Sequence, residues 1–231
     1  MGPLFVLVHS PLVGPLTWTL VADDLGRRGN SVLTPELANP TSAPFWSRHA
    51  DSVARGLAGL PNVEPVVLVG HSGAGPLLPS IARAAAVPVA AYIFVDAGLP
   101  TGDTSRMDAG GFADQLRDLY ARGERFPNWR EEDLRGEVPD PALRARLMVE
   151  LRPQPFAFWE ERLPVIDNWP DAGVAYLQFT DTYAADAEQA RRLGWPCHRL
   201  QGGHFHMLVD PVAVAGALLD LAQQASSLPH V

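Results

Sequence analysis

The chain has 231 residues, 47% of them hydrophobic and 19% charged, a balance typical of a globular domain with a sizeable core. Its formal net charge of −8 disfavours nucleic acid and anionic membrane surfaces as partners. All 18 basic residues are arginines, which excludes chemistry that needs a Schiff base on a lysine.

The N-terminal segment reads as structure rather than as a targeting signal. Residues 1–10 lack the basic flank and cleavage pattern of a signal peptide, and their apolar run is too short to cross a bilayer. We therefore interpret Leu4–Val8 as the first core strand. The single Cys197 cannot form an internal disulfide, which favours a reducing, cytoplasmic compartment.

Strand-like and helix-like segments alternate at the start of the chain. After Leu4–Val8, apolar residues recur at helical spacing over Thr17–Arg28 and again over Ser47–Leu60. Ser31–Leu33 reads as a short strand between them, and Asn39–Pro44 has the composition of a loop.

A glycine-bracketed serine follows. Val66–Val69 has the length and composition of a buried parallel strand, and a helix is expected to open at Pro76. Ser72 lies between them, surrounded by glycines that tolerate unusual backbone angles: Gly70, Gly73 and Gly75. This context predicts a nucleophile elbow, a sharp turn that exposes a serine Oγ above the end of a sheet. A purely structural turn is the alternative, because glycine and serine are common in turns.

The pattern changes after the apolar run Val89–Val95, which ends in Asp96. Over residues 99–170 the strand-like runs vanish, and helix-like segments occur at Gly111–Arg122 and Pro141–Leu151. We predict one domain of residues 1–231, with a core of 1–98 and 171–231 and a helical cap insertion of 99–170. The aromatic residues of this insertion either build its own small core or line an apolar substrate pocket: Trp129, Phe156, Phe158, Trp159 and Trp169.

Alternation resumes beyond residue 170. Strands are expected at Val174–Thr180 and Cys197–Leu200, and helices near Asp186–Leu193 and from Pro211 to about Gln224. Repeated strand-helix units predict an α/β fold with a mostly parallel sheet covered on both faces. Functional residues then belong at the carboxyl ends of the strands.

Three motifs together resemble the α/β-hydrolase superfamily along nearly the whole chain: Leu4–His9 before the oxyanion loop, Gly70–Ser72 at the elbow, and Gly202–His204 followed by Asp210-Pro211. The segment Val95–Pro100 is similar to that of the small esterase and hydroxynitrile-lyase-like branch. One departure is Ala74, which stands where the elbow motif more often has glycine.

Serine is a poor nucleophile unless a base removes its proton and a third group orients that base. The resemblance assigns the base to His204, with His206 as its competitor and a structural role for both as the alternative. His9 and His71 are expected to be hydrogen-bonded supports of the oxyanion loop and the elbow.

The acid has three candidates. Asp96 ends the strand directly after the elbow unit, whereas Asp181 and Asp186 follow the strand that carries the acid in most of the superfamily. We favour Asp96 over Asp181 and Asp186, although Asp96 also reads as a structural loop anchor and Asp186 as a helix N-cap.

The oxyanion hole shows a second departure from the family. Pro11 stands where a backbone donor is usual, and proline has no N–H. One donor is expected from Gly73, and the other from the backbone of Ser10 or Leu12 or from the Ser10 hydroxyl.

These residues predict a serine hydrolase that cleaves a small, largely apolar ester, thioester or lactone through an acyl-enzyme, with no metal or cofactor and a small molecule as its partner. Two alternatives stay open. One is a lyase on the same triad, weakened by the lack of a lysine to steady the leaving anion. The other is a ligand-binding relative that has lost its chemistry. Aspartyl-type epoxide hydrolase or dehalogenase chemistry is disfavoured by Ser72.

Overall fold

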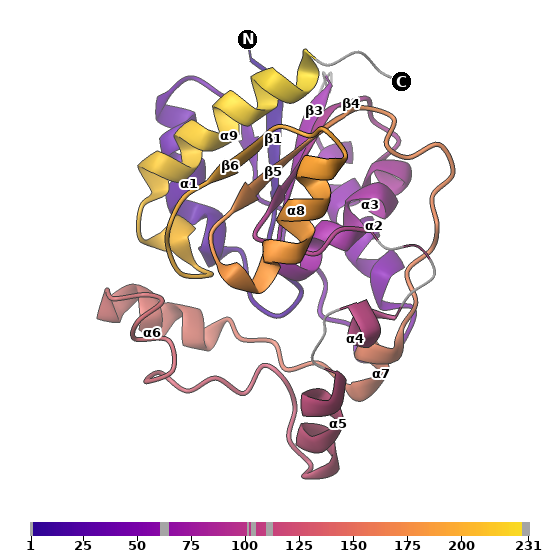
Figure 1. Cartoon of the computed structure of the whole chain (residues 1–231), viewed down its shortest axis with the longest axis vertical. Coiled ribbons are helices and arrows are strands. Elements are labelled where there is room, and N and C mark those ends of the chain that lie inside the picture. Colours follow the sequence, from indigo (N-terminus) through magenta and orange to yellow (C-terminus); the bar gives the residue numbers. More distant parts are fainter. Residues whose placement is uncertain (1, 61–64, 101, 103–104, 110–112, 228–231) are drawn as a thin grey trace.

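The computed structural model describes residues 2–60, 65–100, 102, 105–109 and 113–227. Its centre is a six-stranded sheet of order β2-β1-β3-β4-β5-β6, in which every neighbouring pair is parallel (Figure 1). The strands are β1 (Leu4–Val8), β2 (Val32–Leu33), β3 (Val66–His71), β4 (Val89–Val95), β5 (Gly173–Gln178) and β6 (Cys197–Arg199). The predicted α/β fold with a mostly parallel sheet is confirmed.

Helices cover both faces of the sheet. On one face α1 (Leu16–Arg27) and α9 (Pro211–Ser226) pack against side chains such as Val67 and Val69. On the other face α2 (Phe45–Ala58), α3 (Leu78–Ala85) and α8 (Ala184–Arg192) pack against side chains such as Val66 and Leu68. Successive strand residues point to opposite faces, so a run that is apolar at every position supplies both cores.

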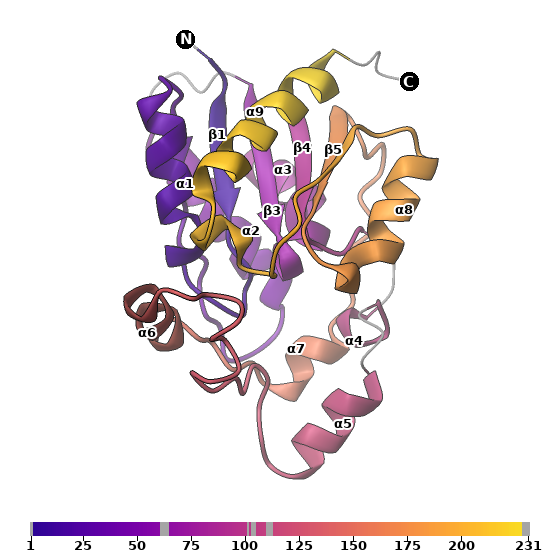
Figure 2. The same cartoon turned by 60° about the vertical axis from the view of Figure 1, so that its left-hand side comes forward.

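The segment between β4 and β5 is helical. It contains α4 (Arg106–Ala109), α5 (Ala113–Ala121), α6 (Pro141–Val149) and α7 (Phe156–Glu160). Figure 2 shows these helices gathered beyond the carboxyl ends of the strands. Where this segment is described, none of its residues joins the sheet, and Ser105 and Arg162 form an isolated antiparallel bridge. Its division from the core as a cap stays a prediction.

Two glutamates of this segment cap helices of the core. Glu150 accepts a hydrogen bond from Leu16 N at the start of α1, at 2.9 Å. Glu161 accepts from Phe45 N at 2.5 Å and from Trp46 N at 3.0 Å, at the start of α2. Prolines precede both helices and offer no side-chain cap, so these carboxylates satisfy N–H groups that lack intrahelical partners. The helical segment is thereby tied to the core by charge-assisted bonds.

No helix among the described residues is long and apolar enough to span a membrane.

Candidate active site

The turn after β3 holds Ser72 in a strained conformation. A 3-10 helix, η1 (Ser72–Leu77), begins at the serine itself, and Ser72 has φ 56°, in the left-handed region that side chains normally avoid. The helix was expected to open at Pro76. That prediction is wrong, because the chain turns into η1 at once and Pro76 lies inside it. A strained residue at a strand-helix junction fits a nucleophile elbow.

Close packing explains two of the surrounding glycines. A Cβ on Gly75 would lie 2.5 Å from the carbonyl oxygen of Gly98, and a Cβ on Gly70 would lie 3.0 Å from the side chain of Leu78. Both positions therefore need glycine for close approach rather than for flexibility. Ala74 is fully buried in the apolar core, so the departure from glycine at this position is accommodated.

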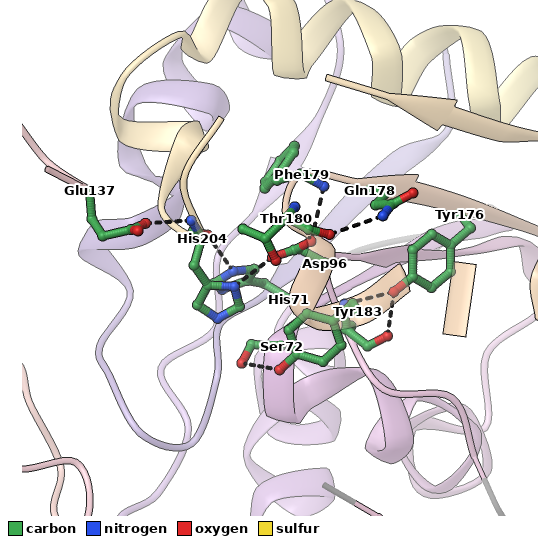
Figure 3. A network of polar contacts seen from close by, with 11 residues as sticks. His71, Ser72, Asp96, Glu137, Tyr176, Gln178, Phe179, Thr180, Tyr183 and His204 are labelled. Carbon is green, nitrogen blue, oxygen red and sulfur yellow. Dashed lines mark hydrogen bonds and ion pairs between the residues drawn. The ribbon is translucent and has the colours of Figure 1, made fainter. Parts of the chain in front are cut away.

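The structure brings Asp96 and His204 together. His204 lies in the loop between β6 and the 3-10 helix η3 (His206–Leu208), and its Nδ1–H donates to Asp96 Oδ2 at 2.7 Å. Figure 3 shows the carboxylate enclosed by the loop that follows β5. There Oδ1 accepts from Phe179 N at 2.9 Å and Thr180 N at 2.8 Å, while Oδ2 accepts from Thr180 Oγ1 at 2.9 Å.

These bonds keep Asp96 ionised although it is fully buried. Burial alone would raise the pKa of Asp96, but the hydrogen bonds from His204, Thr180 and Phe179 outweigh it and leave the pKa below its usual value. Its backbone also has a left-handed φ of 41°. The loop after β5, where the acid more often resides in this fold, here supplies donors to an acid from β4.

The other two candidate acids point elsewhere. The Asp181 side chain is 83% exposed and pairs with Arg199 at 2.8 Å. Asp186 lies within the first turn of α8, where Oδ1 accepts from Leu99 N at 3.0 Å. The interpretation of Asp186 as an N-cap is wrong, since Tyr183 occupies that position. Of the three acids, Asp96 alone contacts His204.

Two further histidines support the site. His71 Nε2–H donates to the carbonyl oxygen of His204 at 2.9 Å, and the two rings lie 4.5 Å apart. His9 Nδ1–H donates to Ser10 O at 2.8 Å, and its Nε2 accepts from Leu37 N at 3.1 Å. Burial lowers the pKa of His9 to about 4 and that of His71 well below its usual value, so both are neutral at pH 7. Their expected supporting contacts are therefore present.

A glutamate outside the predicted motifs holds the His204 backbone. Glu137, in the loop before α6, accepts a hydrogen bond from His204 N at 2.5 Å. A Cβ on Gly203 would clash with this carboxylate, which explains a small residue there. No local sequence pattern signals this contact, because 67 residues separate the two partners.

The loop after β1, which is the expected oxyanion loop, places a serine hydroxyl beside Gly73. Ser10 is buried, and its Oγ accepts from Leu12 N at 3.3 Å. A Cβ on Gly73 would lie 3.3 Å from this Oγ, so the Ser10 hydroxyl and the Gly73 backbone are close neighbours. Because Leu12 N donates to Oγ, the hydroxyl proton of Ser10 is available to another acceptor.

Tyr183 is a site residue that the sequence did not indicate. It ends the 3-10 helix η2 (Asp181–Tyr183), and its hydroxyl lies 3.3 Å from Ser72 Oγ. Its ring stacks on the His204 imidazole, with centroids 5.6 Å apart and planes inclined by 17°. Figure 3 shows Tyr183, His204 and Ser72 converging from three separate segments of the chain. Burial raises the pKa of Tyr183 to about 12.

His206, the competing base, packs its ring against the ring of Phe179, with the two centroids 5.4 Å apart. The aromatic residues of the helical segment have three settings, of which the first is that of Trp169, packed against Tyr92 and Phe94 of β4. Phe158 and Trp159 are buried in a cluster that also contacts Leu12 of the oxyanion loop. Trp129 instead contacts Phe205, next to His204, at 5.8 Å.

Two cavities lie away from these groups. One of about 400 Å³ lies between α2, α3 and residues 164–166, and another of about 150 Å³ shares residues 164–166. Ser72 and His204 line neither of them. Within the described ranges, no group of three or more His, Cys, Asp or Glu side chains is arranged to hold a metal ion.

A sequence profile of the alpha/beta hydrolase family matches residues 5–217 of the chain. No curated protein sequence matches it significantly. Three solved structures show the likeness in fold. An extracellular α/β-hydrolase from a Paenibacillus species, described as sharing structural and functional homology with tobacco salicylic acid binding protein 2, is 20% identical with a TM-score of 0.74. The alignment covers 95% of this chain and 99% of that one.

The other two are esterase and hydrolase structures. Polyneuridine aldehyde esterase is 17% identical with a TM-score of 0.72, over 96% of this chain and 100% of that one. A pyrethroid hydrolase from Sphingobium faniae JZ-2 is 19% identical with a TM-score of 0.72, over 98% and 99%. At these identities the likeness concerns the fold.

Proposed function

The chain belongs to the alpha/beta hydrolase family, and from this we propose that it is a serine hydrolase cleaving a small, largely apolar ester, thioester or lactone through an acyl-enzyme. The observation that carries the proposal is the hydrogen bond from His204 to the buried Asp96, at the same end of the sheet as Ser72 with its φ of 56°. An oriented base near a serine held in a strained turn is what a weak hydroxyl nucleophile requires.

In this proposal each residue has a defined role. His204 takes the proton of Ser72 as Oγ attacks the substrate carbonyl, and later gives that proton to the leaving group. Asp96 holds the imidazole with Nδ1 protonated, so Nε2 is free to act as the base. A water molecule then attacks the acyl-enzyme while His204 takes its proton. His204 returns this proton to Ser72 Oγ as the acid is released.

The oxyanion hole combines a backbone and a side-chain donor. Gly73 N–H is the donor that follows the nucleophile in this fold. The Ser10 hydroxyl, beside Gly73 and with its proton free, takes the place of the backbone donor that Pro11 lacks. Removing one such donor typically costs about 100-fold to 1000-fold in kcat.

The surroundings support an apolar substrate. The oxyanion loop contacts the aromatic cluster of Phe158 and Trp159, and Trp129 and Phe205 pack together beside His204. Two of the solved structures with this fold are named as an esterase and as a pyrethroid hydrolase. The lyase alternative stays weaker, because the chain has no lysine to place beside Ser72. A cytoplasmic location, expected from the single Cys197, stays a prediction.

A fluorophosphonate probe tests the proposal. Wild-type protein should be labelled covalently, and Ser72→Ala should not be, while both show the same thermal unfolding. Ser227→Ala, which removes an exposed hydroxyl at the end of α9, is the matched control and should label like the wild type. Folded wild-type protein that resists the probe would identify a binding protein without catalysis. Labelling that persists in Ser72→Ala would reject Ser72 as the nucleophile.

A further inference from the structure

Tyr183 touches both the proposed nucleophile and the proposed base. Its hydroxyl lies 3.3 Å from Ser72 Oγ, and its ring stacks on the imidazole of His204. The mechanism above uses Gly73, Ser10, His204 and Asp96 and leaves this hydroxyl without a task. A partly buried phenol that contacts both a nucleophile and its base has a position suited to chemistry.

The sheet order decides on which side of Ser72 the hydroxyl lies. Ser10 follows β1 and Tyr183 follows β5, and β1 and β5 lie on opposite sides of β3 in the sheet. The two residues thus approach Ser72 from opposite directions. A carbonyl oxygen that points toward Gly73 and Ser10 faces away from Tyr183, which excludes Tyr183 as an oxyanion donor.

The leaving oxygen is the remaining polar atom of the tetrahedral intermediate on the Tyr183 side. It is bonded to the same carbon as Ser72 Oγ, and it must lie next to His204 in order to receive a proton. The Tyr183 hydroxyl is within hydrogen-bond range of Ser72 Oγ and its ring lies against His204. The hydroxyl therefore lies within hydrogen-bond reach of the position that the leaving oxygen has to take.

We propose that the Tyr183 hydroxyl donates a hydrogen bond to the leaving-group oxygen and so adapts the site to esters of alkyl alcohols. The inference rests on the proposed function. As the bond between the carbonyl carbon and this oxygen breaks, its electron pair stays on the oxygen, and the proton that His204 took from Ser72 passes to it. Tyr183 keeps its own proton and stabilises the charge that builds up before the transfer is complete.

The electrostatics of the site fit this role. Burial raises the pKa of Tyr183 to about 12, so the phenol remains a neutral donor at neutral and mildly alkaline pH. The same hydroxyl is paired with Ser72 in the structure, so it is not left unsatisfied. The bond to Ser72 is replaced by the bond to the leaving oxygen when an ester binds.

Leaving groups of different basicity test the proposal. An alkoxide needs stabilisation and a proton in order to leave, whereas 4-nitrophenolate leaves without either. Tyr183→Phe removes the hydroxyl and keeps the ring on His204. We expect kcat/KM for ethyl butyrate to fall about 10-fold to 100-fold, and kcat/KM for 4-nitrophenyl butyrate to change less than about threefold. The acyl group is the same, so binding of the acid portion cancels from the comparison.

Two further variants control the experiment. Tyr120→Phe removes a hydroxyl that bonds Gln154 O and Trp159 Nε1 in the helical segment, and it should act equally on both esters. Tyr183→Leu also lacks the hydroxyl and should reproduce the discrimination if the phenylalanine variant unfolds. An equal loss on both esters, or no loss on ethyl butyrate, overturns the role of Tyr183. Ser72→Ala distinguishes failure of the proposed function from failure of the proposed role of Tyr183. Activity that survives in Ser72→Ala overturns the proposed function itself.

Discussion

The carboxylate of Asp96 and the imidazole of His204 lie 2.7 Å apart across 108 residues of sequence. The acid comes from the end of β4, yet the loop after β5 supplies three of its hydrogen bonds. The neighbouring strand thus completes the acid site without contributing the acid.

Replacing Asp96 by asparagine should remove the group that fixes the tautomer of His204. We expect kcat with an ester substrate to fall on the order of 10⁴-fold, as for the equivalent change in a serine protease. Asp181→Asn is the matched control, because Asp181 is exposed and paired with Arg199, and it should change kcat less than about tenfold. Both variants are assayed at saturating ester from pH 6 to 9, with thermal unfolding as the check on folding. The opposite ranking would move the acid to Asp181.

Strain at Ser72 predicts an unusual order of stability. A residue other than glycine in the left-handed region costs about 1–2 kcal/mol. Ser72→Gly should therefore be about 1 kcal/mol more stable than Ser72→Ala, a difference of about 2–4 °C in Tm. The same pair at Ser80, inside α3, should show the reverse order, since glycine weakens a helix by about 1 kcal/mol. Equal stabilities at residue 72 would show that the turn relaxes and stores no strain.

Buried neutral histidines predict that stability falls on acidification. Burial lowers the pKa of His49 to about 3, assisted by the charge on Arg106. Below about pH 6.5 His49 is protonated in the unfolded chain but stays neutral in the folded protein. The free energy of unfolding therefore decreases as the pH falls. The loss from this one residue is about 2 kcal/mol between pH 7 and pH 5.

Substituting His49 isolates that contribution. In urea unfolding at pH 7 and pH 5, His49→Gln should lose about 2 kcal/mol less than the wild type over the same interval. The absolute stability of the variant does not enter, because only the change with pH is compared. Between pH 7.5 and 8.5, where the ring is neutral in both states, the two proteins should respond alike. Identical losses from pH 7 to pH 5 would mean that folded His49 takes up its proton.

Glu137 is expected to position His204 for catalysis. Glu137→Ala leaves His204 N without its acceptor, and we expect kcat to fall about tenfold with little change in KM, with a stability loss of about 1–3 kcal/mol. Glu137→Gln keeps an acceptor oxygen and should recover most of kcat. Glu160→Ala, which removes an exposed carboxylate of the same segment, is the control for charge. A rise in KM at constant kcat would argue for a role in substrate binding instead.

The regular elements were predictable because their signal is local. The buried run over Val89–Val95 and the helical spacing that ends near Arg27 depend only on neighbouring residues, and both elements occur where expected. The short helices α4 and α7 were not foreseen, since four or five residues show no period. The prediction of a helix start at Pro76 was wrong because proline fits the start of a helix and equally the inside of a 3-10 helix.

The residues of the candidate site likewise fall into those that the sequence indicates and those that it does not. Ser72 carries a motif, and Asp96 and His204 end or follow strands, so topology alone brings them to one edge. Tyr183 and Glu137 carry no such mark, because each acts through a contact that forms only when distant loops meet. The catalytic roles of all these residues stay predictions until the variants above are measured.

The contact between Glu137 and the His204 backbone limits how the helical segment can be exchanged. A chimera that receives this segment from a relative would leave the histidine loop with an amide lacking its acceptor, unless the graft carries an acid at the matching place. Diversification of the segment toward new substrates is therefore restricted at Glu137, as it is at Glu150 and Glu161, which cap helices of the core. In a chimera, Glu137 and the loop that carries His204 should therefore come from the same parent protein, although they lie on different sides of the point where the chain re-enters the sheet.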